Sequence, residues 1–168
     1  MLITKSDFST YDRQISQTDF GNVDQFIRDA HFSDLKELMG MDFYFDVLRN
    51  PTTTKNSALI NGGTYTYSGN TYTNVGIKAV LVHYAYARYV LQGSNTDTPF
   101  GFVQKNTPES TEVSYQEKKS IYTMNRQIAY DYWDNVRIFI ERNVSDYPLY
   151  KYMKMRKFKF SKISGKDI

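Results

Sequence analysis

The sequence predicts a mainly α-helical fold: a small bundle of about four helices, one of them long, with an inserted β-hairpin and extended terminal arms. Apolar residues recur at helical spacing in four separate stretches, whereas only one stretch alternates in the manner of paired β-strands. At 168 residues, the chain has the length of one domain with a modest hydrophobic core.

The first two helices are predicted on either side of Gly40. Asn22 is suited to cap the first helix, and Gly40 is suited to end it. Its inward stripe is expected to comprise Val23, Phe26, Ile27, Ala30, Leu35 and Leu38. A short second helix is predicted over Met41–Leu48, because a proline at position 51 disfavours helical backbone at Asn50.

The inserted hairpin is predicted over residues 64–73, where Thr and Tyr alternate on both sides of Gly69-Asn70. With these two residues as the turn, Tyr67 lies opposite Tyr72, and Tyr65 lies on the same face. An isolated hairpin is only marginally stable in water, so this one needs support. We expect the three tyrosines to lie at an inter-subunit or partner contact; packing on their own domain is the alternative.

The third helix is predicted from a cap at Asn74 to an end at Gly93. Its stripe is expected to comprise Ile77, Val80, Leu81, Tyr84, Ala87 and Leu91. The fourth helix is predicted from Ser114 to Asn143, about 45 Å at 1.5 Å per residue, and Ser114 with Glu117 matches a capping box. Its stripe is expected to comprise Ile121, Met124, Ile128, Tyr132, Val136, Phe139 and Ile140.

Four further stretches lack a helical or alternating pattern. Residues 1–21 predict an extended lead-in, residues 52–61 a polar connection, and residues 94–108 an irregular segment. Residues 149–168 predict an extended arm that follows a body of residues 1–148. Ordering so much irregular chain costs about 1–2 kcal/mol of backbone entropy per residue, which favours contacts with other subunits.

The arm is distinguished by its charge. Residues 150–168 carry seven Lys or Arg and one acid, whereas the preceding 149 residues carry 14 basic and 17 acidic side chains. Extended backbone alternates its side chains between two faces. One face then presents Tyr150, Tyr152, Lys154, Arg156, Phe158, Phe160 and Lys162, the residues that we expect to bind a partner. A protein groove is favoured; a nucleic acid, bound through phosphates and base stacking, is the alternative.

Composition argues against several other classes of protein. The chain has no cysteine, which rules out disulfides and thiolate metal sites. It shows no apolar run suited to a signal peptide and no membrane-spanning stretch, so we expect a protein made in the cytoplasm that does not enter membranes.

Residues suited to catalysis are sparse. His31 and His83 lie far apart in the sequence, and His31 is expected at a helix surface or boundary. Asp42/Asp46 and Asp131/Asp134 each place two acids on one helical face, which could hold Mg²⁺, although an ion-paired solvated face is the commoner arrangement. We therefore expect no enzyme and no catalytic, cofactor-binding or metal site.

The order of these parts resembles one family, the phage head–tail connector proteins that form adaptor rings beneath the portal. The likeness covers about residues 2–147 and is closest to the version in tailed phages of gut Bacteroidetes, including crAss-like phages. The residues that carry it are Leu2-Ile3-Thr4, Val23–Ala30, Leu35–Gly40, the hairpin leading into Val75–Val80, His83–Tyr89, Thr96–Lys105 and the long fourth helix.

The resemblance implies a structural virion protein, found at the head–tail junction, that links capsid to tail. It implies a homo-oligomeric ring, expected to be a dodecamer, that binds the portal protein on one side and further connector or tail proteins on the other. DNA would be met only as the genome passing through the channel. A ring subunit needs two different complementary surfaces, because its contacts are heterologous. The alternative is a nucleic-acid-binding accessory protein that acts through its basic arm.

Overall fold

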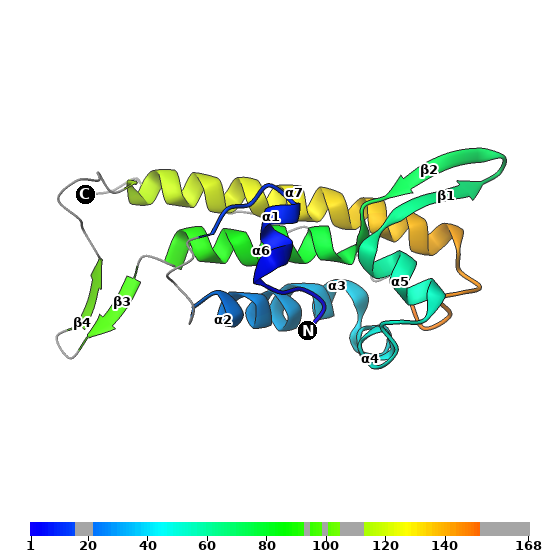
Figure 1. Cartoon of the computed structure of the whole chain (residues 1–168), viewed down its shortest axis with the longest axis horizontal. Coiled ribbons are helices and arrows are strands. Elements are labelled where there is room, and N and C mark those ends of the chain that lie inside the picture. The colour runs from blue at the N-terminus through cyan, green and yellow to red at the C-terminus, as the bar shows by residue number, and fades with distance from the viewer. Residues whose placement is uncertain (16–21, 93–94, 99–100, 105–112, 152–168) are drawn as a thin grey trace, which may run out of the picture.

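The fold is mainly helical and is built around one pair of long helices (Figure 1). The structure, a computed structural model, describes residues 1–15, 22–92, 95–98, 101–104 and 113–151. Helix α6 (Gly76–Gln92) packs along α7 (Tyr115–Arg142), which has 28 residues and begins at the predicted capping box: Ser114 Oγ accepts from the backbone N–H of Glu117. Helix α2 (Asn22–Asp29) lies against the other side of α6, which is therefore the central and most buried helix.

The first predicted helix exists, but a π-helical segment interrupts it. Helix α2 passes into the π-helix η1 (Ala30–Leu35) and then into α3 (Lys36–Met39), which ends at Gly40 as predicted, with a φ of 78°. A π-helix turn is wider than an α-helix turn and is frequent at sites where a side chain must be redirected. Here it turns His31 and Asp34 into the interior, together with Ala30 and Leu35.

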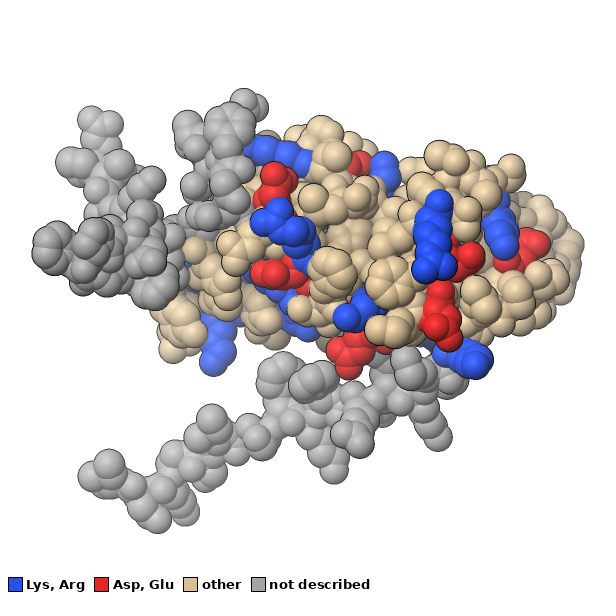
Figure 2. Space-filling view, turned by 90° about the horizontal axis from the view of Figure 1, so that it is seen from below, with Lys and Arg blue, Asp and Glu red and all other residues tan. Residues whose placement is uncertain are grey.

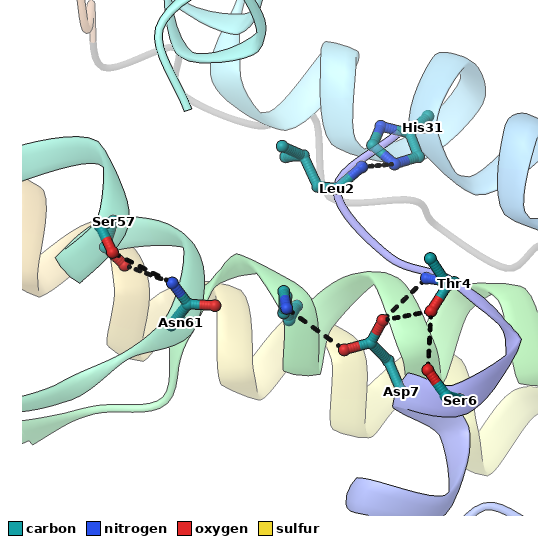
Figure 3. A network of polar contacts seen from close by, with 8 residues as sticks. Leu2, Thr4, Ser6, Asp7, His31, Ser57 and Asn61 are labelled. Atoms are coloured by element: carbon teal, nitrogen blue, oxygen red, sulfur yellow. Dashed lines mark hydrogen bonds and ion pairs between the residues drawn. The ribbon is translucent and has the colours of Figure 1, made fainter. Parts of the chain in front are cut away.

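The sequence predicted an extended lead-in at the N-terminus, but part of it is helical. Thr4 and Asp7 form a capping box, and α1 (Lys5–Thr10) follows it, with Phe8 fully buried. Figure 3 shows the Asp7 carboxylate accepting from the N–H and hydroxyl of Thr4, and the backbone N–H of Leu2 donating to His31. Only one turn and a half of helix forms, which is too short for a periodic apolar stripe.

Residues 52–61 are not a connection; most of them form helix α5 (Thr54–Asn61), which follows α4 (Met41–Arg49). Leu59 and Ile60 are the only large apolar residues of α5, and both are buried. Two adjacent large apolar residues cannot show a helical period, so the packing of α5 on α6, and not its own pattern, stabilises it.

The predicted hairpin is present, but its turn lies one residue earlier than expected. Strands β1 (Gly63–Tyr67) and β2 (Asn70–Asn74) are antiparallel, and Tyr65 pairs with Tyr72 while Tyr67 pairs with Asn70. The turn is therefore Ser68-Gly69, with φ values of 50° and 80°. A two-residue turn with positive φ at both positions matches the twist of the strands, and this preference outweighs the Gly-first turn that we predicted.

The prediction of irregular structure for residues 94–108 is wrong for eight of them. Strands β3 (Asn95–Thr98) and β4 (Gly101–Gln104) form a second antiparallel hairpin, at the opposite end of the helix pair from β1–β2 (Figure 1). Asn95–Thr98 has no apolar residue and Gly101–Gln104 has two adjacent ones, so neither segment shows the apolar–polar alternation that indicates a strand.

On α6 the core contains the predicted residues except Leu91, which is half-buried, whereas α7 departs from its predicted stripe in its N-terminal half. Met124 is 54% exposed, and the neighbouring inward positions are occupied by Asn125, Ala129 and Trp133. The helical period was predicted correctly, but a polar residue faces inward because it bonds to distant partners, which apolar spacing cannot reveal. None of the described helices combines the length and the apolar character needed to cross a membrane.

Candidate functional site

The tyrosine face of the first hairpin surrounds one guanidinium group. The Cζ atom of Arg142, in the last turn of α7, lies 3.9 Å from the ring centre of Tyr72, 4.9 Å from that of Tyr67 and 5.9 Å from that of Tyr65. Its Nη1 also donates a 2.9 Å hydrogen bond to the hydroxyl of Tyr65. A planar guanidinium favours such stacking through cation–π attraction, so Arg142 attaches the hairpin to the body.

Aromatic contacts extend this attachment into the core. The rings of Tyr65 and Tyr72 stack at 5.7 Å, and Tyr65 meets the buried ring of Phe139 edge-on at 4.9 Å. Tyr65 and Tyr72 are half-buried, whereas Tyr67 is 43% exposed. The structure thus brings the three predicted residues together on one face, and it packs two of them mainly on their own body.

The base of the hairpin is held by a side chain and by two glycines. Asn135 of α7 accepts from the backbone N–H of Val75 at 2.9 Å and donates to the carbonyl of Thr73 at 3.1 Å. The backbones of Gly62 and Gly76 pass close to each other at the base of the hairpin. A Cβ on Gly62 would lie 2.5 Å from the carbonyl oxygen of Asn74, and a Cβ on Gly76 would lie 2.5 Å from the backbone nitrogen of Gly62. The predicted cap Asn74 is buried and accepts from the N–H of Gly76 at 3.1 Å. The hairpin therefore leaves the body in a fixed direction.

The other face of the hairpin is polar and open. Thr64, Thr66, Thr71 and Thr73 are exposed, as are Ser68, Gly69 and Asn70 at the tip. Figure 1 shows β1 and β2 extending past the helices beside the C-terminal end of α7. The result is a rigidly based projection with one face held by Arg142 and one face in solvent.

An ion-paired cluster around the buried carboxylate of Asp34 connects η1 with both long helices. The carboxylate of Asp34 lies between Arg88 of α6 and Arg126 of α7, with a distance of 3.0 Å to Arg126 Nη1. The Arg126 Cζ lies 5.0 Å from the ring centre of Tyr84, and burial, with the Asp34 charge, raises the pKa of Tyr84 to about 12. Tyr84 is therefore a neutral phenol at physiological pH, and the cluster acts as an internal connection between three elements.

Both histidines are buried and neutral, so the expectation of a surface or boundary position for His31 is wrong. The Nε2 atom of His31 accepts from the N–H of Leu2 at 3.2 Å, and burial, with the N-terminal ammonium, lowers the pKa of His31 to about 4. His83 bonds through Nδ1 to Asn125 Oδ1 at 3.1 Å, and burial lowers its pKa, with the Arg13 charge acting in the same direction. Since an amide oxygen only accepts, His83 carries its proton on Nδ1.

The comparison with known families matches residues 35–158 to a family of unknown function, DUF6712. The matched segment begins in η1 and includes α3 to α7, both hairpins and the first part of the arm. It spans well over half of the chain. The chain belongs to the DUF6712 family. No curated protein and no solved structure matches it.

The arm of this DUF6712 protein begins with a residue that packs against the body. The ring of Tyr150, which we predicted to bind a partner, lies 5.5 Å from Phe43 and 6.4 Å from Trp133, both edge-on, and is half-buried. The other predicted arm residues, Tyr152, Lys154, Arg156, Phe158, Phe160 and Lys162, lie outside the described residues. The family match continues to residue 158, past the body boundary that we expected at residue 148.

The paired acids of the DUF6712 chain form part of its solvated surface. Asp134 forms an ion pair with Arg137 at 2.6 Å, and Arg137 also pairs with Glu141 at 2.6 Å. Asp131 accepts from Gln127, and Asp46 accepts weakly from Asn50. Within the described ranges, His and acidic side chains form no group of three or more suited to a metal ion.

Sequence reasoning missed the residues that organise these sites. Arg142, Asn135, Asn125 and Asp34 stand in helices where polar residues usually face solvent, and their partners are far away in the chain. Two of them are the asparagines of α7, an amide type that is disfavoured inside a helix unless its side chain has specific partners. That disfavoured placement was the one available signal.

Proposed function

We propose that this protein is a structural subunit of a phage virion, a head–tail connector that assembles into a ring beneath the portal. The observation that carries the proposal is the hairpin β1–β2, which is fixed at its base by Asn135 and projects beyond the helical body. A ring subunit needs two different complementary surfaces, because its contacts are heterologous, and a projecting hairpin can supply one of them.

The exposure of the hairpin supports an intermolecular role. Tyr67 offers a large ring near the tip, 43% exposed, beside the open threonine face. Tyrosine combines a large apolar area with few rotatable bonds, which makes it frequent in protein interfaces. We propose that Tyr67 and the exposed edge of Tyr72 contact an adjacent subunit or the portal, while Tyr65 and Arg142 hold the hairpin in position.

The helical body supports the proposal in a second way. The arrangement of helices and hairpin agrees with the architecture that the resemblance to connector proteins implies. Two polar groups in the described interior join elements together: Asp34 joins η1 to α6 and α7, and Asn125 joins α7 to α6 and to Arg13. These connections favour a stable building block.

The direct test is to locate the chain in particles of a phage that encodes it. We expect several copies per particle, arranged as a ring between portal and tail in electron microscopy. Removal of its gene should leave filled heads without tails. Complete tailed particles that lack the chain would refute the proposal. Strong, salt-dependent DNA binding by the purified protein, with normal tail attachment in its absence, would favour the nucleic-acid-binding alternative.

A further inference from the structure

An exposed apolar patch lies on the α2–α4 side of the molecule. Phe32 is 53% exposed, Met41 63% and Phe45 37%. The rings of Phe32 and Phe45 both contact the buried ring of Tyr44, at 6.4 and 5.3 Å, and Met41 lies one helical turn from Phe45. We call Phe32, Met41 and Phe45 the α4 patch. Exposed apolar side chains that gather in this way mark an interaction surface.

The surface around the patch has an excess of acids. Five carboxylates on α2–α4 form no ion pair with any described residue: Asp24, Asp29, Glu37, Asp42 and Asp46. The basic residues of the same helices are Arg28, Lys36 and Arg49. Figure 2, which views the molecule from this side, shows acidic and basic side chains among uncharged ones. Elsewhere on the body, some acids pair with cations, namely Asp7, Asp134 and Glu141, while others, such as Asp131, form no ion pair with a described residue.

The arm is the segment of this chain whose chemistry matches that surface. Residues 150–168 carry seven Lys or Arg and one acid, together with Tyr152, Phe158, Phe160 and two methionines. The arm therefore combines apolar side chains for the α4 patch with cations for the free carboxylates. Its last 17 residues could extend about 55 Å at 3.3 Å per residue, enough to cross a neighbouring subunit.

The place where the arm begins favours a neighbouring copy over its own body. Tyr150 packs on Phe43, which lies on the buried face of α4, whereas Met41 and Phe45 lie on its exposed face. To reach its own α4 patch, the arm would have to pass around α4, because Tyr150 lies against the buried face of that helix and the patch lies on the exposed face. We propose that the basic aromatic arm of each copy docks on the α4 patch of the adjacent copy. This inference rests on the proposed ring.

In this arrangement, Lys154 and Arg156 meet Glu37 and Asp42, and the aromatic side chains of the arm cover Phe32 and Phe45. Each exposed charge pair contributes little by itself, about 0.2–1 kcal/mol. A closed ring makes the same contact at every junction, so the arms reinforce the ring through effective concentration.

Cysteine cross-linking of full-length chains tests the docking directly, because the natural chain has no cysteine. One chain carries Ser33→Cys beside the patch, and another carries Ser161→Cys in the arm. Mixed and oxidised, they should form a covalent heterodimer. In the matched control, the first chain carries Ser120→Cys, at an exposed position on α7, in place of Ser33→Cys. This pair should give at least about fivefold less heterodimer. Equal yields would overturn the proposal.

Charge reversal supplies a second measurement. Glu37→Lys with Asp42→Lys on the Ser33→Cys chain should lower the heterodimer yield at least about fivefold, and Lys154→Glu with Arg156→Glu on the Ser161→Cys chain should restore it. Asp131→Lys, an exposed acid on α7, should leave the yield unchanged. If Ser33→Cys and Ser161→Cys combined on one chain give only internally closed monomer, the arm docks on its own body and the proposal fails.

The two proposals fail differently. Cross-linked purified protein that is absent from particles would leave the docking intact and refute the connector function. A ring present in particles, with a Ser33→Cys and Ser161→Cys yield no higher than that of the control, would leave the connector function intact and refute the docking.

Discussion

Arg142 lies 3.9 Å from the ring centre of Tyr72, so the last turn of α7 and the second strand of the hairpin form one packed unit. The contact explains how a two-stranded hairpin, only marginally stable by itself, keeps a fixed position. Asn135 fixes the base and Arg142 fixes the face, while the tip extends into solvent.

Replacement of Arg142 by Gln should loosen the hairpin without unfolding the body. The cation–π contacts and the hydrogen bond to Tyr65 are lost, which should cost about 1–2 kcal/mol. Faster amide hydrogen exchange confined to β1 and β2 would report it. The matched control is Arg137→Gln on the same helix, whose surface ion pairs should contribute less than about 1 kcal/mol. Unchanged exchange in Arg142→Gln would contradict this role.

Replacement of Asp34 by Asn should destabilise the whole body. Arg88 and Arg126 would lose the carboxylate that they share, and because both guanidinium groups are only partly buried, the loss should be about 1.5–3 kcal/mol, the range for hydrogen bonds to charged groups. Urea unfolding should show the loss as a lower midpoint. The solvent-facing control Asp131→Asn should change the midpoint little. A small effect of Asp34→Asn would mean that the two arginines find other partners.

His31 predicts an acid-sensitive stability. Its pKa is lowered by burial to about 4 in the folded protein, against about 6.5 when unfolded, so the unfolded chain binds the proton more tightly. The contribution of His31 to the free energy of unfolding should therefore be fully present above pH 6.5. It should decrease by about 3 kcal/mol as the pH falls toward 4.

Unfolding curves between pH 7.5 and 4.5 test this prediction. His31→Gln, whose side-chain oxygen can still accept from Leu2, should flatten the pH dependence, although His83 contributes in the same direction because its pKa is also lowered. The same slope in the wild type and in His31→Gln would show that His31 does not titrate as the structure indicates.

The predictable parts of the fold were those with local causes. The stripe of α6 and the capping box at Ser114 depend on neighbours within a few residues; the capping box is confirmed, and so is the stripe except for Leu91. The hairpin tyrosines share a face, as predicted, although Tyr72 pairs with Tyr65 instead of Tyr67. The pairing of the two strands is shifted by two residues, which leaves each side chain on its predicted face. A shift of one residue would have moved the side chains of one strand to the other face.

The parts that sequence did not predict have distant causes. Asn125 faces inward because it accepts from Arg13, 112 positions away, and bonds to His83. The π-helix at Ala30–Leu35 forms where it can direct both His31 and Asp34 toward partners elsewhere in the chain. In the sequence, Arg142 is an ordinary basic residue at a helix C-terminus, and only its contact with Tyr72 of the hairpin shows its role.

Substitution of Tyr67 should distinguish the role of the hairpin in folding from its proposed role in assembly. Tyr65 and Tyr72 are half-buried on Phe139 and Arg142, whereas Tyr67 is 43% exposed near the tip. Tyr67→Ser should therefore change the free energy of unfolding by less than about 1 kcal/mol but impair ring assembly, because an exposed aromatic residue contributes most when a partner buries it. Tyr72→Ser is the matched control and should lower stability as well as assembly. Sedimentation of the purified variants and their incorporation into particles measure both properties. Normal assembly of Tyr67→Ser would show that the hairpin tip is not a subunit contact.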